Sequence, residues 1–151
     1  MLKRFVFPVT LGLLLAFAMA VTAAAAEPNV GTPAFKAISS KSGTLKYGFK
    51  GAAVYDNALR KWSFYKMTTI TRRKVEGYVN QINNNLALAA GLHRVAVYDF
   101  KSHAWREYKS GPDDSTAMLK NNFLLTSAYA RVKILNGPYI KYQNGTWVRS
   151  R

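Results

Sequence analysis

The 151-residue chain contains no cysteine, only two histidines and only seven carboxylate side chains. Without cysteine it forms no disulfide bond and carries no cysteine-linked lipid anchor, so its fold must rest on apolar packing and hydrogen bonds. Two histidines and no thiolate make a zinc site unexpected. The chain also lacks G-x-S-x-G, the nucleophile motif of serine hydrolases. We therefore expect neither a metal nor a small-molecule cofactor.

Residues 1–26 have the three-part pattern of a secretory signal peptide. Lys3 and Arg4 form a positive n-region, an uncharged stretch follows, and Ala24 and Ala26 occupy the positions of an A-x-A cleavage site. An uncleaved membrane anchor is the alternative, because about 20 apolar residues can span a bilayer. The Ala-rich end of the stretch and the lack of a basic cluster after it favour cleavage after Ala26. We expect a secreted or periplasmic protein.

Basic residues dominate the rest of the chain. The formal net charge is +15, and about +13 remains after the signal peptide is removed. Such a charge opposes compaction and indicates an anionic partner. Basic groups next to aromatic residues suit an anionic polymer, whose backbone attracts cations and whose units stack on rings, or an anionic membrane surface. The predicted binding residues are Arg60, Lys61, Trp62, Tyr65, Arg72, Arg73, Lys74, Arg94, Trp105, Arg106, Tyr108 and Trp147.

Hydrophobic periodicity predicts a single mainly-β domain over residues 44–151, after a flexible lead-in over 27–43 that is rich in Pro, Gly and small polar residues. Alternating apolar residues or runs of Thr, Val and aromatics indicate strands at 44–50, 53–55, 62–73, 94–100 and 123–135. Asn144-Gly145 is the strongest hairpin-turn signal. Residues 75–92 fit a helix or extended structure equally well. A short helix after the turn at 111–115 would make the domain α+β, which is the alternative fold class.

An internal repeat covers the clearest strands. Ala-Val-Tyr-Asp at 53–56, followed by Trp62 and Tyr65-Lys66, recurs 43 residues later with every spacing kept, and 142–147 is a degenerate third copy. We interpret the unit as a hairpin in which Asp bonds to backbone N–H groups of the turn and Trp pairs across the strands. A second match, between 84–95 and 121–132, has an offset of 37 residues.

The repeated hairpin, V-Y-D followed by a short turn and W, resembles the hairpins of kelch propeller blades over about 15 residues per copy. The paired glycines of kelch blades are missing from this sequence. A closed propeller also needs at least four blades of about 40–50 residues. The chain is too short for that, so the resemblance does not place it in the family. Aromatic residues that pack a small β core, or that form an exposed row for stacking, both explain the pattern.

Three functions follow as expectations from these features. The leading one is an exported, non-enzymatic cationic protein that binds anionic envelope or extracellular polymers, with an antimicrobial or bacteriocin-like protein as its sharper form. The second is a small secreted ribonuclease, which needs a carboxylate base, a histidine acid and cations for the phosphate. The third is an inhibitor or structural partner of another exported protein. The candidate catalytic residues of the ribonuclease are Glu76, Glu107, His93 and His103.

Overall fold

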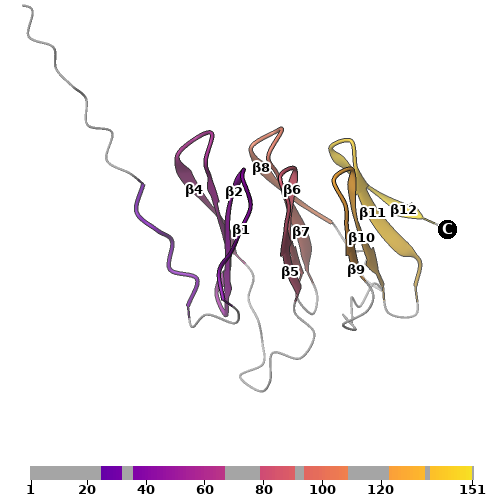
Figure 1. Cartoon of the computed structure of the whole chain (residues 1–151). Helices are drawn as coiled ribbons and strands as arrows, with labels where there is room; N and C mark the ends of the chain where they lie inside the picture. Colours follow the sequence, from indigo (N-terminus) through magenta and orange to yellow (C-terminus); the bar gives the residue numbers. More distant parts are fainter. Residues whose placement is uncertain are drawn as a thin grey trace, which may run out of the picture.

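The computed structural model describes residues 25–31, 36–66, 79–90, 94–108, 123–134 and 137–150. Three four-stranded antiparallel sheets stand side by side (Figure 1). The first contains β1 (Ile38–Ser39), β2 (Gly43–Gly48), β3 (Gly51–Asp56) and β4 (Lys61–Lys66). The second contains β5 (Val79–Ile82), β6 (Leu86–Ala90), β7 (Val95–Asp99) and β8 (Ala104–Glu107). The third contains β9 (Phe123–Leu125), β10 (Tyr129–Lys133), β11 (Tyr139–Gln143) and β12 (Thr146–Ser150).

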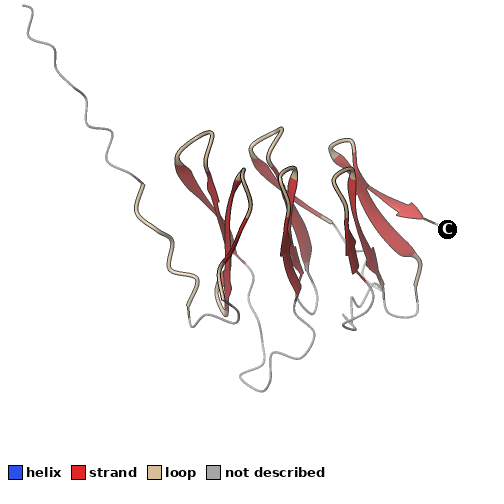
Figure 2. Ribbon diagram, in the orientation of Figure 1, coloured by secondary structure: helices blue, strands red, loops and turns tan. Residues whose placement is uncertain are grey.

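Each sheet is a meander in which consecutive strands pair with one another. The predicted mainly-β fold is confirmed, because the described residues form strands and turns with no helix (Figure 2). The ambiguous region is extended where it is described, with β5 and β6 between residues 79 and 90. The helix considered after residues 111–115 falls outside the described residues. Within the described part, no helix is long and apolar enough to cross a membrane.

The turns that join the third and fourth strands follow from local chemistry. Asp56 Oδ1 accepts hydrogen bonds from the N–H groups of Ala58 and Leu59, at 2.9 and 3.2 Å. Asp99 Oδ1 accepts one from the Lys101 N–H at 2.9 Å. In the third sheet, the two-residue turn Asn144-Gly145 has φ values of +52° and +85°, as a type I′ hairpin requires. The aspartates therefore stabilise the turns as predicted.

The repeat is a whole four-stranded meander rather than a hairpin alone. Tyr55 pairs with Trp62, Tyr98 with Trp105 and Tyr142 with Trp147 in the same register. The ring centroids of these pairs lie 5.3, 5.5 and 5.4 Å apart. The first two hairpins are thus equivalent at the predicted offset of 43, and the degenerate third copy is equivalent to them across its shorter turn. The match at offset 37 is not a structural equivalence, because residue 86 begins the second strand of its sheet and residue 123 the first.

Apolar side chains fill the spaces between the sheets. Leu45, Val54, Ala87 and Ala89 contribute to the core between the first two sheets. A second core lies between the second and third sheets, and its members include Leu86, Leu88, Val95, Val97, Ala130, Val132, Ile134 and Ile140. The second sheet is buried on both faces, so β6 is an unbroken apolar run, Leu-Ala-Leu-Ala-Ala.

The first sheet also contacts residues from the stretch expected as a lead-in. Ile38 and Ser39 form β1 and pair with Leu45 and Thr44. Val30 is buried, and its carbonyl accepts a hydrogen bond from the Lys50 N–H at 2.8 Å. Glu27 forms an ion pair with Lys46. Residues 27–30 therefore pack against the first sheet.

Candidate functional site: the outer face of the third sheet

Neighbouring sheets are joined by hydrogen bonds that repeat along the stack. The Tyr98 hydroxyl donates to Asp56 Oδ2 at 3.0 Å, and the Tyr142 hydroxyl donates to Asp99 Oδ2 at 2.8 Å. We call these contacts the Tyr–Asp links. Each aspartate therefore organises its own turn through one carboxylate oxygen and accepts the tyrosine of the next sheet through the other. The Tyr–Asp links fix the spacing and the order of the three sheets.

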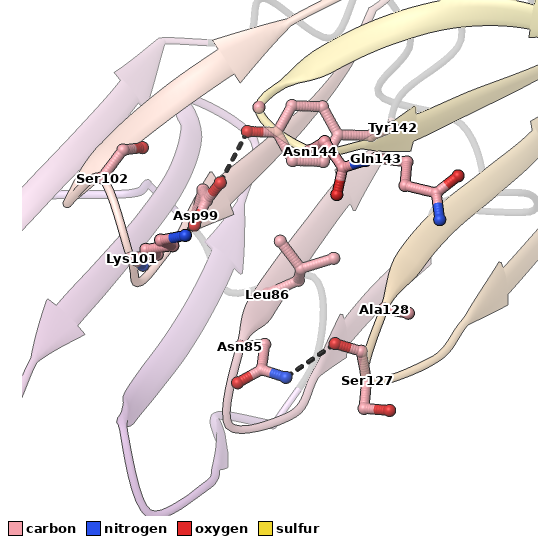
Figure 3. A pocket seen from close by; sticks show the side chains of 11 residues that line it. Asn85, Leu86, Asp99, Lys101, Ser102, Ser127, Ala128, Tyr142, Gln143 and Asn144 are labelled. Carbon is pink, nitrogen blue, oxygen red and sulfur yellow. Dashed lines mark hydrogen bonds between the residues drawn. The ribbon is translucent and has the colours of Figure 1, made fainter.

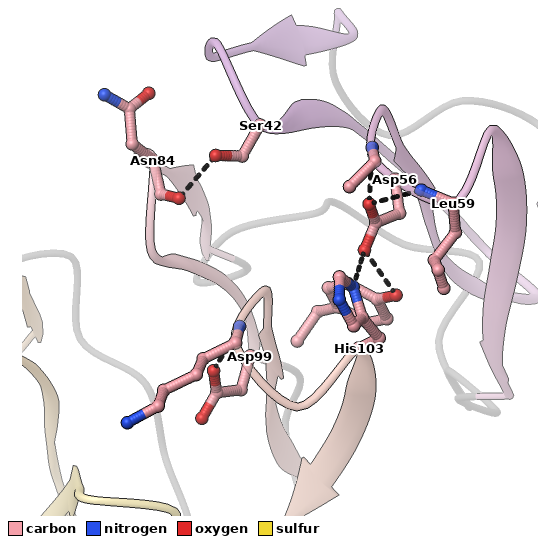
Figure 4. Close-up of polar contacts among 9 residues, drawn as sticks. Ser42, Asp56, Leu59, Asn84, Asp99 and His103 are labelled. Atoms are coloured by element: carbon pink, nitrogen blue, oxygen red, sulfur yellow. Dashed lines mark hydrogen bonds and ion pairs between the residues drawn. The ribbon is translucent and has the colours of Figure 1, made fainter.

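Tryptophan and asparagine side chains add further links between sheets. Trp105 Nε1 donates to the Ser63 carbonyl at 3.3 Å, and Trp147 Nε1 donates to the Arg106 carbonyl at 3.0 Å. Asn85 Nδ2 donates to the Ser127 carbonyl at 2.6 Å. Figure 4 shows the Ser42 hydroxyl donating to the Asn84 carbonyl at the corresponding place between the first two sheets. Trp105 and Trp147 therefore join sheets to one another.

Asp56 is the most enclosed charged group of the described residues, with 1% of its surface exposed. His103 Nδ1 lies 2.7 Å from Asp56 Oδ2 (Figure 4). Burial raises the pKa of this carboxyl group, but hydrogen bonds from His103, from Tyr98 and from the two turn N–H groups outweigh burial and lower the pKa below 3.8. Asp56 is therefore held as a carboxylate between the first two sheets.

The third sheet has one face toward the second sheet and one face away from it. Ala130, Val132 and Ile140 belong to the core. Alternation places their strand neighbours on the opposite side. We call this side the outer face. It consists of Tyr129, Arg131, Lys133, Tyr139 and Lys141, with the exposed Leu124 and Val148 beside it on β9 and β12.

The outer face differs from the equivalent faces of the other two sheets. The register makes Arg131 equivalent to Leu88 and to Leu45, and Lys141 equivalent to Val97 and to Val54. The other positions follow the same pattern. Lys133 replaces Ala90 and Tyr47, and Tyr139 replaces Val95 and Ala52. Positions that bury apolar side chains in two sheets carry cations and tyrosines in the third. Burying these three cations under a further apolar sheet would be costly.

On the outer face, each cation lies over a tyrosine ring. The Arg131 guanidinium carbon is 4.7 Å and the Lys133 ammonium 4.8 Å from the ring centroid of Tyr139. The Lys141 ammonium is 4.3 Å from the ring centroid of Tyr129. These distances are within the range of cation–π contacts. Arg131 and Lys141 also stand directly opposite each other in the register, an arrangement of like charges that destabilises a sheet.

The predicted binding residues are distributed over several places and do not form one surface. Arg60 and Lys61 are exposed at the third turn of the first sheet, and Trp62 is half-buried with the Lys46 ammonium 5.5 Å from its ring centroid. Arg94 lies 3.7 Å from Glu107, and Arg106 is exposed on β8. Residues 72–74 fall outside the described part of the chain.

The aromatic members of the predicted set meet between sheets. Tyr65 stacks on Trp105 with 5.4 Å between ring centroids, and Tyr108 meets Trp147 edge-on at 5.9 Å. The Tyr65 hydroxyl is buried without a hydrogen-bond partner among the described residues. Its burial and the nearby Glu107 carboxylate raise the pKa of Tyr65 above its ordinary value of 10.0. These rings pack the stack, in agreement with the core interpretation of the aromatic pattern.

The candidate ribonuclease residues are only partly described. Glu76 and His93 fall outside the described residues. His103 lies in the turn before β8 at φ +52° and uses Nδ1 to contact Asp56. Glu107, at the end of β8, lies near Arg94. The described members of this set are therefore engaged in contacts within the stack.

No protein-family model matches this chain, and no curated protein matches it significantly. Among solved structures, the crystal structure of the N-terminal domain of Nup159 is similar, with a TM-score of 0.42 and 9% identity over 77% of this chain. The aligned part is 29% of that chain, so this protein spans less than a third of its neighbour's length. At this score the likeness carries no argument. The fold and the outer face define the protein as a stack of β-meanders with one basic, aromatic surface.

The outer face was not among the predicted binding residues. Its signal is present in the sequence, since residues 129–134 alternate Tyr, Arg and Lys with Ala, Val and Ile. That alternation predicts a half-buried strand with a polar side. The polar side of this strand forms a larger basic surface only because β10 pairs with β11, which brings a second row of Tyr and Lys beside the first.

Proposed function

We propose that this protein is an exported, non-enzymatic binding protein whose outer face engages anionic polymers of the cell envelope or the extracellular matrix. The observation that carries the proposal is the replacement of apolar residues by three cations and two tyrosines on a single face of the stack. The net charge of the chain, +15, supports an anionic partner.

The spacing of the outer face suits a linear polyanion. Arg131 and Lys133 are two residues apart on β10, which separates them by about 7 Å along the strand. Lys141 stands on the neighbouring strand, about 5 Å across the sheet. Tyr129 and Tyr139 already carry cations above their rings, so charge and ring faces are presented together. A chain lying along the sheet would meet cations for its acidic groups and rings for its apolar surfaces.

The test compares two variants with the same net charge. The outer-face variant carries Arg131→Gln, Lys133→Gln and Lys141→Gln. The control carries Lys41→Gln, Lys50→Gln and Lys66→Gln, three exposed residues of the first sheet. Binding to immobilised heparin, a model anionic polysaccharide, is measured at low salt by biolayer interferometry. We expect the outer-face variant to bind at least about tenfold more weakly and the control to change less than about threefold.

Three results would contradict the proposal. Equal losses in both variants would show that only net charge matters. Binding that stays unchanged in high salt would exclude charge-driven association, which must weaken with screening. Binding to vesicles containing anionic lipid, with no binding to heparin, would move the target from a polymer to a membrane surface. Circular dichroism of each variant shows whether the sheets remain folded.

A further inference from the structure

A cleft lined by both polar and apolar groups opens between the second and third sheets, on the side where the Tyr142 hydroxyl meets Asp99. Its volume is about 850 Å³, within the range of small-molecule sites. Figure 3 shows that residues of both sheets line it, with Leu86 between the two walls. One wall comes from the second sheet and includes Asp99, Lys101 and Ser102. The opposite wall comes from the third sheet and includes Ala128, Gln143 and Asn144.

The cleft exists because the third sheet has a shorter turn. Between the first two sheets, the four-residue turn of the second sheet supplies two large side chains. Phe100 is buried beside Tyr98, with 5.2 Å between ring centroids, and His103 reaches Asp56. The corresponding turn of the third sheet is only Asn144-Gly145. In the described part of the chain, no side chain of that turn reaches back to Asp99, so the space filled by Phe100 and His103 is open here.

The lining groups offer both donors and acceptors of hydrogen bonds. Asp99 Oδ1 accepts a hydrogen bond from the Lys101 N–H, and Asp99 Oδ2 accepts one from the Tyr142 hydroxyl. A carboxylate oxygen has two lone pairs, so each can accept another. The Lys101 ammonium and the Ser102 hydroxyl supply donors, and the amide of Gln143 supplies both kinds. One carboxylate and one ammonium leave the wall without a large excess of charge.

This combination selects a neutral, polyhydroxylated ligand. A phosphate or sulfate group would be repelled by Asp99, and a divalent cation would find only one carboxylate, next to an ammonium. Adjacent hydroxyl groups of a sugar can donate to Asp99 and accept from Lys101 at the same time. We propose that the cleft binds one saccharide unit, with Asp99 and Lys101 as its main contacts. This site is separate from the outer face and does not depend on polymer binding there.

The test is a titration of the ¹⁵N-labelled protein followed by amide chemical shifts. The probes are the methyl glycosides of glucose, galactose and N-acetylglucosamine. We expect at least one to shift the amides of residues 101, 102 and 145 saturably, with a dissociation constant of about 1 mM, as is reasonable for a ligand of this size. Ala128→Phe, which places a ring in the cleft, should weaken that binding at least about tenfold. The matched control, Ala58→Phe, changes an exposed turn residue of the first sheet and should leave it unchanged.

Two further variants separate this site from its surroundings. Asp99→Asn removes the charged acceptor but keeps a side-chain oxygen for Tyr142, and should weaken sugar binding about five- to tenfold. The outer-face variant with three glutamines should bind the sugar within about twofold of the wild type. The proposal is overturned if none of the three glycosides gives a saturable shift, or if Ala128→Phe binds as well as Ala58→Phe. In the outer-face variant, loss of heparin binding with intact sugar binding would support two separate sites.

Discussion

Replacing Asp56 with alanine should destabilise the protein more than any other change in the Tyr–Asp links. The carboxylate accepts four hydrogen bonds while only 1% exposed. Its loss leaves the hydroxyl of Tyr98, itself 1% exposed, without a partner, which costs about 1–3 kcal/mol. The exposed turn N–H groups can bond to water instead and add about 0.5 kcal/mol each. His103 has a side chain 37% exposed, so its contact adds less than about 1 kcal/mol.

The expected total is about 3 kcal/mol, or a fall of about 10 °C in Tm. Asp99→Ala is the matched comparison, because Asp99 accepts only two hydrogen bonds and the adjoining cleft gives water access to the Tyr142 hydroxyl. We expect it to cost about 1–2 kcal/mol. The assay is urea denaturation at pH 7 followed by tryptophan fluorescence.

A double-mutant cycle distinguishes a lost link from general damage. In the Asp56→Ala background, Tyr98→Phe removes the orphaned hydroxyl and should restore about 1 kcal/mol, whereas in the wild type it should cost about 1–2 kcal/mol. The reasoning is refuted if Asp56→Ala costs no more than Asp99→Ala. It is equally refuted if Tyr98→Phe has the same cost in both backgrounds.

Two other predictions follow from the same contacts. The pKa of Asp56 is lowered below 3.8 in the folded protein. Its contribution to stability is therefore complete above about pH 4 and is lost as the pH falls further. Acid unfolding of the wild type should show this loss of stability, and Asp56→Asn should not. A second variant gives the outer face the residues of the second sheet at these positions, and it carries Arg131→Leu, Lys133→Ala and Lys141→Val. Because the exposed face becomes apolar, this variant should show concentration-dependent association in light scattering at about 10 μM. A monodisperse monomer would show that the cations do not keep this face free.

The strands and the repeat could be predicted from the sequence because they depend on local patterns. Period-2 alternation located β2, the apolar run of residues 94–100 located β7, and the Tyr-Asp and Trp spacing located the hairpins. The stacking of the sheets could not be predicted in this way, because alternation shows that a strand has two faces without showing which sheet covers each. Asp56 illustrates the difference. Its role in the turn depends on residues two and three positions away, but its second role depends on Tyr98, 42 residues along the chain.

The same reasoning explains why the outer-face cations are absent from the predicted binding residues. Arg131 and Lys133 lie on β10 and Lys141 lies on β11, and each is flanked by core residues. Only the pairing of β10 with β11 places them on one face. The cleft is harder still to foresee, because it results from the shortness of one turn relative to its equivalents. A short turn creates a binding cleft only where a neighbouring sheet forms the opposite wall.

The third sheet differs from the other two sheets on only one of its two faces. Toward the second sheet it keeps the features of the stack, with Tyr142 bound to Asp99 and Trp147 bound to the Arg106 carbonyl. On the outer face, equivalent positions that elsewhere bury apolar residues carry three cations and two tyrosines, and Gln143 stands where the other sheets have Asp. A face that only met water would accept charges of either sign. Arg131 and Lys141 are like charges directly opposite each other, which destabilises the sheet. The tyrosine rings and the Gly137 carbonyl, which accepts a hydrogen bond from Lys133 Nζ, offset part of this cost. The proposed anionic ligand would offset the rest, and it would account for cations alone on this face.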